Sequence, residues 1–174
     1  MDEQSDLYMT EGDTAAVLTR VELAMIRAIE AFNRWAFFLH KGVGGPQLAP
    51  QDIFLLHSIR MRGGAQNLSE LLLFLNRNDV STLQYSLKKI EQFGLIQRVT
   101  GNSKREAGYR LTGAGMTLTE DYAQVRQELL IALVGDVKNL SVALEGAAGA
   151  LERLTGLYDQ STQAVLNRKI MGPR

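Results

Sequence analysis

The sequence predicts a mainly α-helical protein with one small antiparallel pair of strands. Three observations support this fold class. Apolar residues recur every three or four positions over residues 14–40, and again over residues 118–165, as they do on one face of a long helix. Between these segments, residues 79–112 contain a helical pattern, a glycine and two short runs typical of strands. Helix, glycine, strand, polar loop and strand in that order are typical of a winged helix-turn-helix lobe.

The N-terminal part of the chain is predicted to be an acidic arm followed by one long helix. Residues 1–13 carry five carboxylates and no apolar run, so we expect a flexible arm. Residues 14–40 place apolar side chains on one helical stripe, formed by Leu18, Val21, Met25, Ala28, Phe32, Trp35 and Leu39. Because this stripe is more regular than a single surface helix needs, we expect it to pack along another long helix. Three glycines and two prolines in residues 41–50 predict a loop.

The lobe is predicted to begin with two short helices, the second of which forms a helix-turn-helix with the helix after it. Residues 52–61 are apolar at helical spacing, and Gly63 and Gly64 follow them. Asn67 or Ser69 can cap the next helix, whose apolar positions are all leucines. Residues 76–79 then form a short polar turn that ends in Asn78 and Asp79, both good N-cap residues for the third helix. We expect the whole lobe to span residues 50–112.

The third helix of the lobe has one apolar and one polar face. Its apolar stripe consists of Val80, Leu83, Leu87 and Ile90. The opposite face presents Ser81, Thr82, Tyr85, Lys88, Lys89 and Gln92, and so should look outward toward a polar partner. Gly94 is placed to end this helix. Residues 95–100 and 109–111 read as two strands, and the polar residues between them as the tip of a wing.

The C-terminal third is predicted to form dimerisation helices over residues 113–167, after an N-cap at Thr112. A break is expected at residues 135–136 or 139–141, where glycine and polar residues interrupt the apolar stripe. Glycines at positions 146 and 149 each lower helix stability by about 1 kcal/mol relative to alanine. A close contact with a second copy of the chain would compensate for them. Residues 168–174 form a basic tail.

Composition excludes several classes of protein. The chain has 174 residues and 45% hydrophobic content, enough for one sizeable core and therefore one domain overall. There is no cysteine, which excludes disulfides and thiolate metal sites and fits a reducing cytoplasm. No stretch approaches the roughly 18 apolar residues of a membrane span, and the acidic start is not a signal peptide. We therefore expect a soluble cytoplasmic protein.

Positive charge is concentrated in the predicted lobe, and the sequence contains no catalytic motif. The formal net charge is zero, but residues 51–112 carry +4 and the flanking segments −4. The two histidines, His40 and His57, have no neighbouring carboxylate cluster, so we expect no metal and no cofactor. The run Gly42-Val43-Gly44-Gly45 lacks the strand and helix spacing of a nucleotide-binding loop, and no nucleophile motif occurs. An enzyme is not expected.

The run NLSELLLFLNRNDVSTLQYSLKKIEQFGLIQR, residues 67–98, resembles the multiple-antibiotic-resistance regulator (MarR) family of winged-helix transcription factors. The resemblance extends over most of the chain, from about Leu18 to Val165. It implies a homodimer built from the N-terminal and C-terminal helices, which binds double-stranded DNA at a pseudo-palindromic operator, typically as a repressor. Two features depart from the family: Tyr85 replaces a basic or small polar residue, and the wing lacks an Asp-x-Arg motif.

Each residue of the polar face and wing then has an expected role on DNA. Near the start of the third helix, base edges or thymine methyl groups would be contacted by Ser81, Thr82, Gln84 and Tyr85. Lys88 or Lys89 would contact phosphate. On the wing, Lys104 and Arg105 would lie in or along the minor groove, with Arg105 inserted and Asn102 or Glu106 as its support.

Two alternatives stay open at this point. By resemblance, a small aromatic or acidic effector would bind between the lobe and the dimerisation helices, in a pocket lined by Trp35, Phe38, His57 and Tyr122. The simpler interpretation of these four residues is core or interface packing. For the whole protein, the alternative function is a winged-helix module whose outward face binds another protein without specific DNA readout. The zero net charge favours that alternative, and the local charge of the lobe opposes it.

Overall fold

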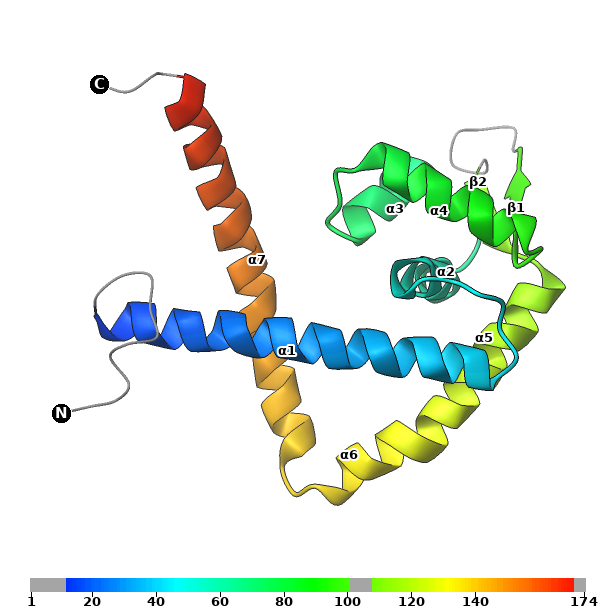
Figure 1. Cartoon of the computed structure of the whole chain (residues 1–174), viewed down its shortest axis with the longest axis horizontal. Coiled ribbons are helices and arrows are strands. Elements are labelled where there is room, and N and C mark those ends of the chain that lie inside the picture. The colour runs from blue at the N-terminus through cyan, green and yellow to red at the C-terminus, as the bar shows by residue number, and fades with distance from the viewer. Residues whose placement is uncertain (1–11, 101–107, 171–174) are drawn as a thin grey trace. The chain divides into compact units, whose positions relative to one another are not determined.

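The computed structural model describes residues 12–100 and 108–170, and the predicted fold class is confirmed: the protein is mainly helical with one antiparallel strand pair (Figure 1). The chain divides into two compact units, residues 1–125 and residues 126–174. The first unit contains α1 (Asp13–Gly42), α2 (Pro50–Arg62), α3 (Leu68–Phe74), α4 (Val80–Gln92), β1 (Ile96–Val99), β2 (Gly108–Leu111) and nearly all of α5 (Gly113–Arg126). None of the described helices is both long and apolar enough to cross a membrane.

Helix α2 lies at the centre of the first unit. It packs against α1 and α4, and Figure 1 shows it nearly end-on between these two helices. Because apolar residues recur along both sides of α2, Ile53, Leu55, Leu56 and Ile59 are all buried. They join a core completed by Leu39, Leu48, Leu71, Leu83, Leu87, Ile90, Leu95, Ile96 and Tyr122.

Local hydrogen bonds explain where α3 and α4 begin. The N–H of Glu70 donates to Asn67 Oδ1 at 3.0 Å, and the N–H of Asn67 donates to Glu70 Oε2 at 3.0 Å. Of the two predicted N-cap residues, Asn67 and Ser69, Asn67 therefore caps α3, in a capping box with Glu70. Asp79 occupies the N-cap position of α4, but its carboxylate does not cap the helix. It accepts instead from Arg77, whose Nε lies 2.8 Å from Asp79 Oδ1. This hydrogen-bonded ion pair lowers the pKa of Asp79 to about 2.

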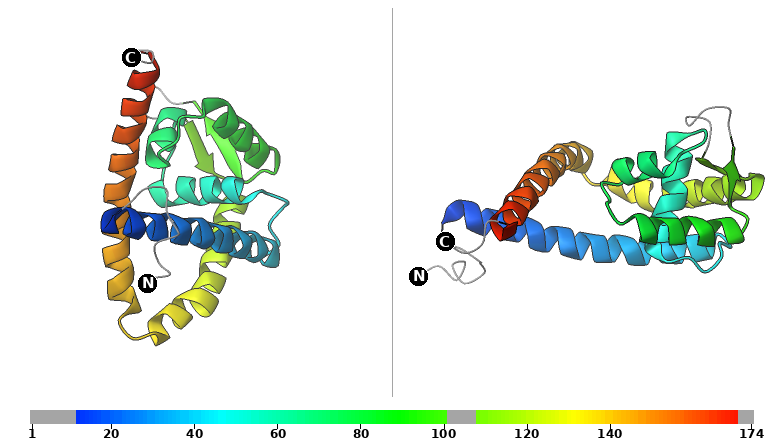
Figure 2. Two further views of the ribbon diagram at one scale, coloured as in Figure 1. Left: turned by 60° about the vertical axis from the view of Figure 1, so that its left-hand side comes forward. Right: turned by 90° about the horizontal axis from the view of Figure 1, so that it is seen from above.

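The wing follows α4 after a sharp turn. Gly94 has φ +70°, a left-handed conformation that favours glycine, as predicted for the residue that ends this helix. Strands β1 and β2 pair antiparallel, with Ile96 opposite Leu111 and Val99 opposite Gly108 (Figure 2). β1 ends at Val99, one residue earlier than predicted.

A third segment extends this sheet. Gln66, which precedes α3, exchanges two backbone hydrogen bonds with Tyr109, at 2.8 and 2.9 Å. A Cβ at position 108 would lie 2.5 Å from the carbonyl of Gln66, so the close approach requires Gly108. The base of the wing is therefore attached to the start of α3.

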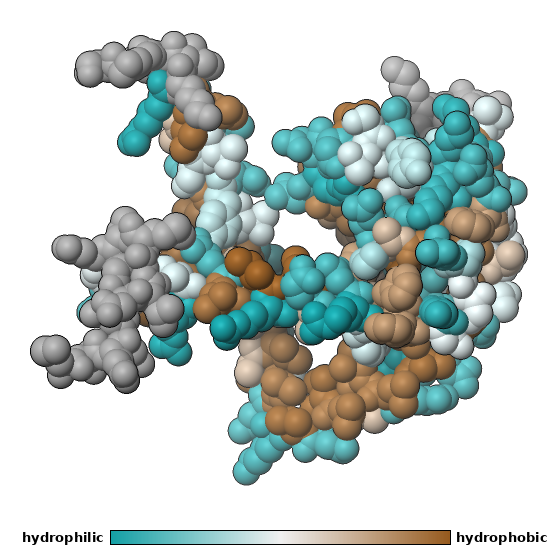
Figure 3. All heavy atoms as spheres, viewed as in Figure 1, coloured by the Kyte–Doolittle hydropathy of each residue, from teal (hydrophilic) through white to brown (hydrophobic). Residues whose placement is uncertain are grey.

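The second unit contains η1 (Gln127–Ile131), a π-helical turn, followed by α6 (Ala132–Asp136) and α7 (Leu140–Ile170). The chain breaks between α6 and α7 as predicted, and Asn139 there has φ +64°. Figure 3 shows apolar surface gathered over η1 and α6. Among the described residues of this unit, the large apolar side chains that are exposed are Leu129, Leu133, Val137, Val142, Leu144, Leu151, Leu157, Tyr158, Val165 and Leu166. A Cβ added at Gly146 or Gly156 would meet no atom within 4 Å.

Candidate nucleic-acid interface

Helix α4 turns its apolar stripe to the core and its polar stripe to solvent. Leu83, Leu87 and Ile90 are fully buried, as the sequence predicts. Val80 differs from the prediction: 44% of its surface is exposed, because it lies in the first turn at the edge of the packed face. Three apolar residues, spaced four and three apart, therefore turn this side of α4 to the core.

The residues predicted to contact bases lie on the outward side of the first two turns of α4. Ser81, Gln84 and Tyr85 are exposed, and Thr82 is half-buried. Tyr85 exposes 69% of its surface, a large fraction for an aromatic residue. These side chains offer hydroxyl and amide groups beside an apolar ring, which together can meet both the polar atoms and the methyl groups of a major groove.

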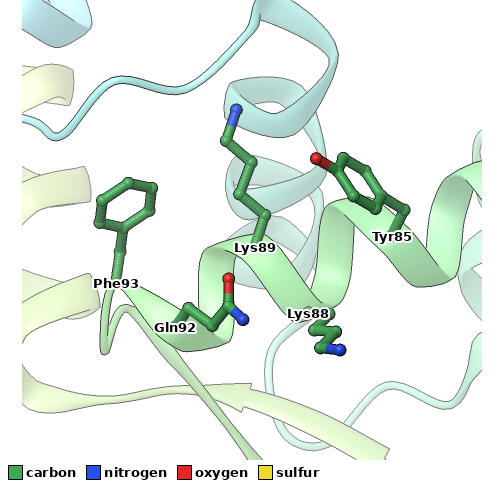
Figure 4. A pocket seen from close by; sticks show the side chains of 5 residues that line it. All are labelled: Tyr85, Lys88, Lys89, Gln92 and Phe93. Atoms are coloured by element: carbon green, nitrogen blue, oxygen red, sulfur yellow. The ribbon is translucent and has the colours of Figure 1, made fainter.

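The two adjacent lysines of α4 have different surroundings. The ammonium of Lys89 lies 3.0 Å from Oδ2 of the buried Asp52 in α2. Lys88 is exposed and makes no ion pair with any residue of ranges 12–100 and 108–170. Figure 4 shows the two side chains leaving α4 in different directions. A shallow groove of about 430 Å³ runs along this face, lined by Tyr85, Lys88, Lys89, Gln92 and Phe93.

The wing adds two cations that the sequence interpretation did not place in the site. Arg98 in β1 and Arg110 in β2 are both exposed. Gln97 lies opposite Arg110, and with its amide oriented to satisfy both groups its oxygen accepts from Arg110 Nε at 2.8 Å and Nη2 at 2.9 Å. The signal available in the sequence was the position of each arginine inside a predicted strand beside the polar wing loop. Lys104 and Arg105, with the predicted supports Asn102 and Glu106, lie outside the described residues.

Three of the four predicted effector-pocket residues lie together. The ring of Tyr122 contacts Trp35 edge-on, with centroids 5.8 Å apart, and lies 4.2 Å from the ring of His57. Phe38 does not join them: it is 66% exposed, and its ring contacts Phe37. Phe38 lies three residues after Trp35, but helical spacing alone did not bring its ring into the cluster.

Phe32 and Phe54 extend the aromatic cluster in place of Phe38. Phe32 stacks on Phe54 with centroids 4.6 Å apart, and its ring lies 6.2 Å from Trp35. An open apolar groove of about 410 Å³ lies beside them, lined by Ile29, Phe32, Asn33, Ala49, Pro50, Gln51 and Phe54. The sequence signal for Phe32 was its place on the α1 stripe, whereas the contribution of Phe54 depends on how α1 and α2 pack.

Comparison with known proteins agrees with this geometry. Residues 48–115 match the family described as the winged helix DNA-binding domain. The chain is similar in structure to Staphylococcus aureus MarR in complex with salicylate and kanamycin, at 14% identity and a TM-score of 0.64, over 83% of this chain and 93% of that one. It is also similar to the S. aureus MepR–DNA complex, at 17% identity and a TM-score of 0.59, over 76% and 94%.

A third similar structure is the transcriptional regulator MosR of Mycobacterium tuberculosis in complex with DNA, at 16% identity and a TM-score of 0.54, over 76% of this chain and 96% of that one. No curated protein matches the sequence. The resemblance to the MarR family is confirmed at the level of the fold: residues 48–115 match a winged helix DNA-binding domain, and the chain has the fold of MarR family transcription regulators.

Proposed function

We propose that this protein is a sequence-specific, DNA-binding transcription regulator of the cytoplasm, acting as a repressor. The observation that carries the proposal is the outward face of α4, where Ser81, Gln84 and Tyr85 are exposed beside the free ammonium of Lys88. Arg98 and Arg110 on the adjacent wing add positive charge to the same lobe. Hydrogen-bonding groups that can read bases, next to cations that can hold phosphates, form the combination that sequence-specific DNA binding needs.

The regulator acts as a homodimer. The support is the exposed apolar surface of each unit: Ile26 and Ile29 on α1 are 61% and 58% exposed, and α7 exposes Val142 and Leu157 at 70% and 56%. Exposed apolar surface of this extent on a monomer indicates an interface. Two protomers related by a twofold axis place two α4 helices in successive major grooves, so the operator is pseudo-palindromic with half-sites about one helical turn apart.

A small aromatic or acidic effector would release the protein from DNA. The aromatic cluster around Trp35, Phe32 and Tyr122, together with the apolar groove beside Phe54, supports binding of a planar apolar molecule. One structurally similar protein is a complex with salicylate. The effector would act by a population shift, to the extent that it binds the DNA-free conformation more tightly than the DNA-bound one.

The alternative function is a winged-helix module that binds a protein through the same face. The exposed rings of Tyr85 and Phe93, 69% and 45% accessible, favour this alternative, as does the net charge of zero. The exposed Lys88 and the arginines of the wing oppose it, because exposed positive charge suits a polyanion better than an apolar protein surface.

Selection of bound duplexes from a random pool, followed by affinity measurements across salt concentrations, tests the proposal. A dimer that neutralises six or more phosphates should lose roughly a thousandfold in affinity between 50 and 200 mM salt. The pool should also converge on a sequence with twofold symmetry. A protein-interaction module would enrich no sequence and would bind duplexes weakly at every salt concentration.

A further inference from the structure

The contact between Lys89 and Asp52 joins the DNA-facing helix to the central helix of the lobe. The Lys89 ammonium lies 3.0 Å from Asp52 Oδ2, and the same oxygen accepts from the N–H of Ala49 at 3.1 Å. The side chain of Asp52 is only 3% exposed, whereas that of Lys89 is 30% exposed. Asp52 therefore holds the first turn of α2 and the third turn of α4 with one carboxylate oxygen.

The buried carboxylate depends on Lys89 for its charge balance. Among residues 12–100 and 108–170, no donor reaches the second oxygen of Asp52, Oδ1. The guanidinium of Arg77 interacts with Asp52 only through space, since Asp79 is its hydrogen-bonded partner and the main reason that the pKa of Arg77 is raised. A buried carboxylate without a paired cation is strongly unfavourable. Lys89 is the one cation in direct contact with it within the described part of the chain.

Lys89 also occupies a special place on α4. It lies four residues after Tyr85 and four before Phe93, so its stem stands between the two exposed rings, as Figure 4 shows. Its ammonium is bound beneath that surface by Asp52, while its neighbour Lys88 points elsewhere and has no ionic partner in the described residues. An ammonium already neutralised by a carboxylate adds little to the attraction for phosphate.

We propose that Lys89 is a positioning residue: held by Asp52, it fixes the rotation of α4 and so the direction in which Tyr85 faces DNA, whereas Lys88 is the residue of this pair that meets phosphate. The effect of Lys89 on DNA binding rests on the proposed function. The ion pair and its effect on α4 in the free protein do not depend on that function.

Four single variants and one double variant of the full chain separate the two lysines. Lys89→Met and Asp52→Asn each remove one partner; asparagine keeps the acceptor for the Ala49 N–H, so the start of α2 is preserved. Lys88→Met is the matched control, because it makes the same chemical change at the next residue. The double variant Asp52→Asn/Lys89→Met tests whether the two side chains act as one unit. The readouts are duplex affinity against salt concentration, and hydrogen exchange of the α4 amides without DNA.

Lys89→Met and Asp52→Asn should each lower affinity for the selected duplex about tenfold, without changing the salt slope, and the double variant should be no weaker than the weaker single variant. Hydrogen exchange of the α4 amides should become faster in Lys89→Met, in Asp52→Asn and in the double variant. Lys88→Met should lower the magnitude of the salt slope by about one per site and leave exchange unchanged. The conservative variant Lys89→Arg, which keeps the charge, should restore parental exchange.

Two results would overturn the inference: a loss of salt slope in Lys89→Met equal to that in Lys88→Met, or unchanged α4 exchange in both Asp52→Asn and Lys89→Met. If no duplex binds the parent protein, the proposed function fails, and the exchange measurement alone still decides whether the Asp52–Lys89 pair holds α4.

Discussion

The hydroxyl of Thr112 donates a hydrogen bond of 2.6 Å to the carbonyl oxygen of Gly94. The two residues are 18 positions apart, and the whole wing lies between them. The Thr112 hydroxyl oxygen also accepts from the N–H of Gly115 at 3.1 Å, and the Thr112 N–H donates to the carbonyl of Leu95 at 3.0 Å. The N-cap of α5 is therefore tied to the turn at which the chain leaves α4, so both ends of the wing are held at one point.

Gly115→Ala should destabilise the protein, because α5 passes close to this turn. A Cβ at position 115 would lie 2.0 Å from the carbonyl oxygen of Leu95, and backbone atoms cannot move aside without disturbing the Thr112 contacts. Overpacking of this kind costs about 1–3 kcal/mol. Gly113→Ala is the control, since its Cβ would meet no atom within 4 Å. Urea unfolding should show a lower midpoint for Gly115→Ala only; equal midpoints for the two variants would contradict the described packing.

His40 should make stability depend on pH. Its side chain is buried, with Nε2 3.1 Å from the carbonyl oxygen of Pro46, and burial lowers its pKa below 6.5 despite that hydrogen bond. Because the unfolded chain then binds the proton more tightly, the contribution of His40 is complete above pH 6.5 and is lost as the pH falls through the lower pKa of the folded state.

The measurement is the free energy of unfolding of the parent and of His40→Gln at pH 8 and pH 5. The parent should lose more stability on acidification than the variant, by up to about 1.4 kcal/mol for each pH unit between the folded and unfolded pKa values. His57 is present in both proteins, so its contribution cancels in the comparison. Parallel pH profiles would show that His40 titrates alike in the folded and unfolded chain.

Tyr85→Ala should weaken specific binding to the selected duplex without altering the salt slope, because the lost side chain is neutral. A good base contact contributes about 1–3 kcal/mol, so a ten- to hundredfold loss is expected. Tyr85→Phe separates the contribution of the ring from that of the hydroxyl. Retained affinity in this variant indicates that the ring contacts a thymine methyl group. In that case the parent protein should lose affinity for a duplex that carries uracil in place of thymine. A random-sequence duplex is the control, and an equal loss on both duplexes would exclude a role in sequence readout.

Arg105→Ala should reduce affinity and lower the magnitude of the salt slope by about one per site, as expected for a guanidinium that lies near phosphates in the minor groove. Asn102→Ala and Glu106→Ala, made in parallel, identify the residue that supports it, because only the true support should reduce affinity when removed. Unchanged binding in both Arg105→Ala and Tyr85→Ala would argue strongly against the proposed interface.

Leu151→Asp should break the dimer. Leu151 lies on the apolar stripe of α7 and is 40% exposed in a single chain, so a charge there would be buried only if a second copy covers it. Gln160→Asp, two and a half helical turns further along and therefore on the opposite face, is the control. Light scattering should give twice the mass of one chain for the parent and the control, and the mass of one chain for Leu151→Asp. A monomeric parent would refute the proposed assembly.

The sequence by itself determined the elements of this fold, because their signals are local. Asn67 and Thr112 cap helices through side chains that reach only three residues along the chain. Gly94 supplies the left-handed conformation that ends α4, and the residues after it, with β-branched Ile96 and Val99, predict a strand. The buried stripe of α4 followed from helical periodicity, which in turn identified the face turned to solvent.

Tertiary structure decided which side chains of that face are free to act. Lys88 and Lys89 are the same residue type at adjacent positions, and nothing local distinguishes them. The difference comes from Asp52, 37 residues earlier in the chain, whose buried carboxylate binds one ammonium and leaves the other exposed. Likewise, Phe54 joined the aromatic cluster because α2 packs against α1 and brings this ring onto Phe32, whereas the ring of Phe38 contacts Phe37. Periodicity predicts which residues share a face, but the partner of each side chain depends on which distant element packs there.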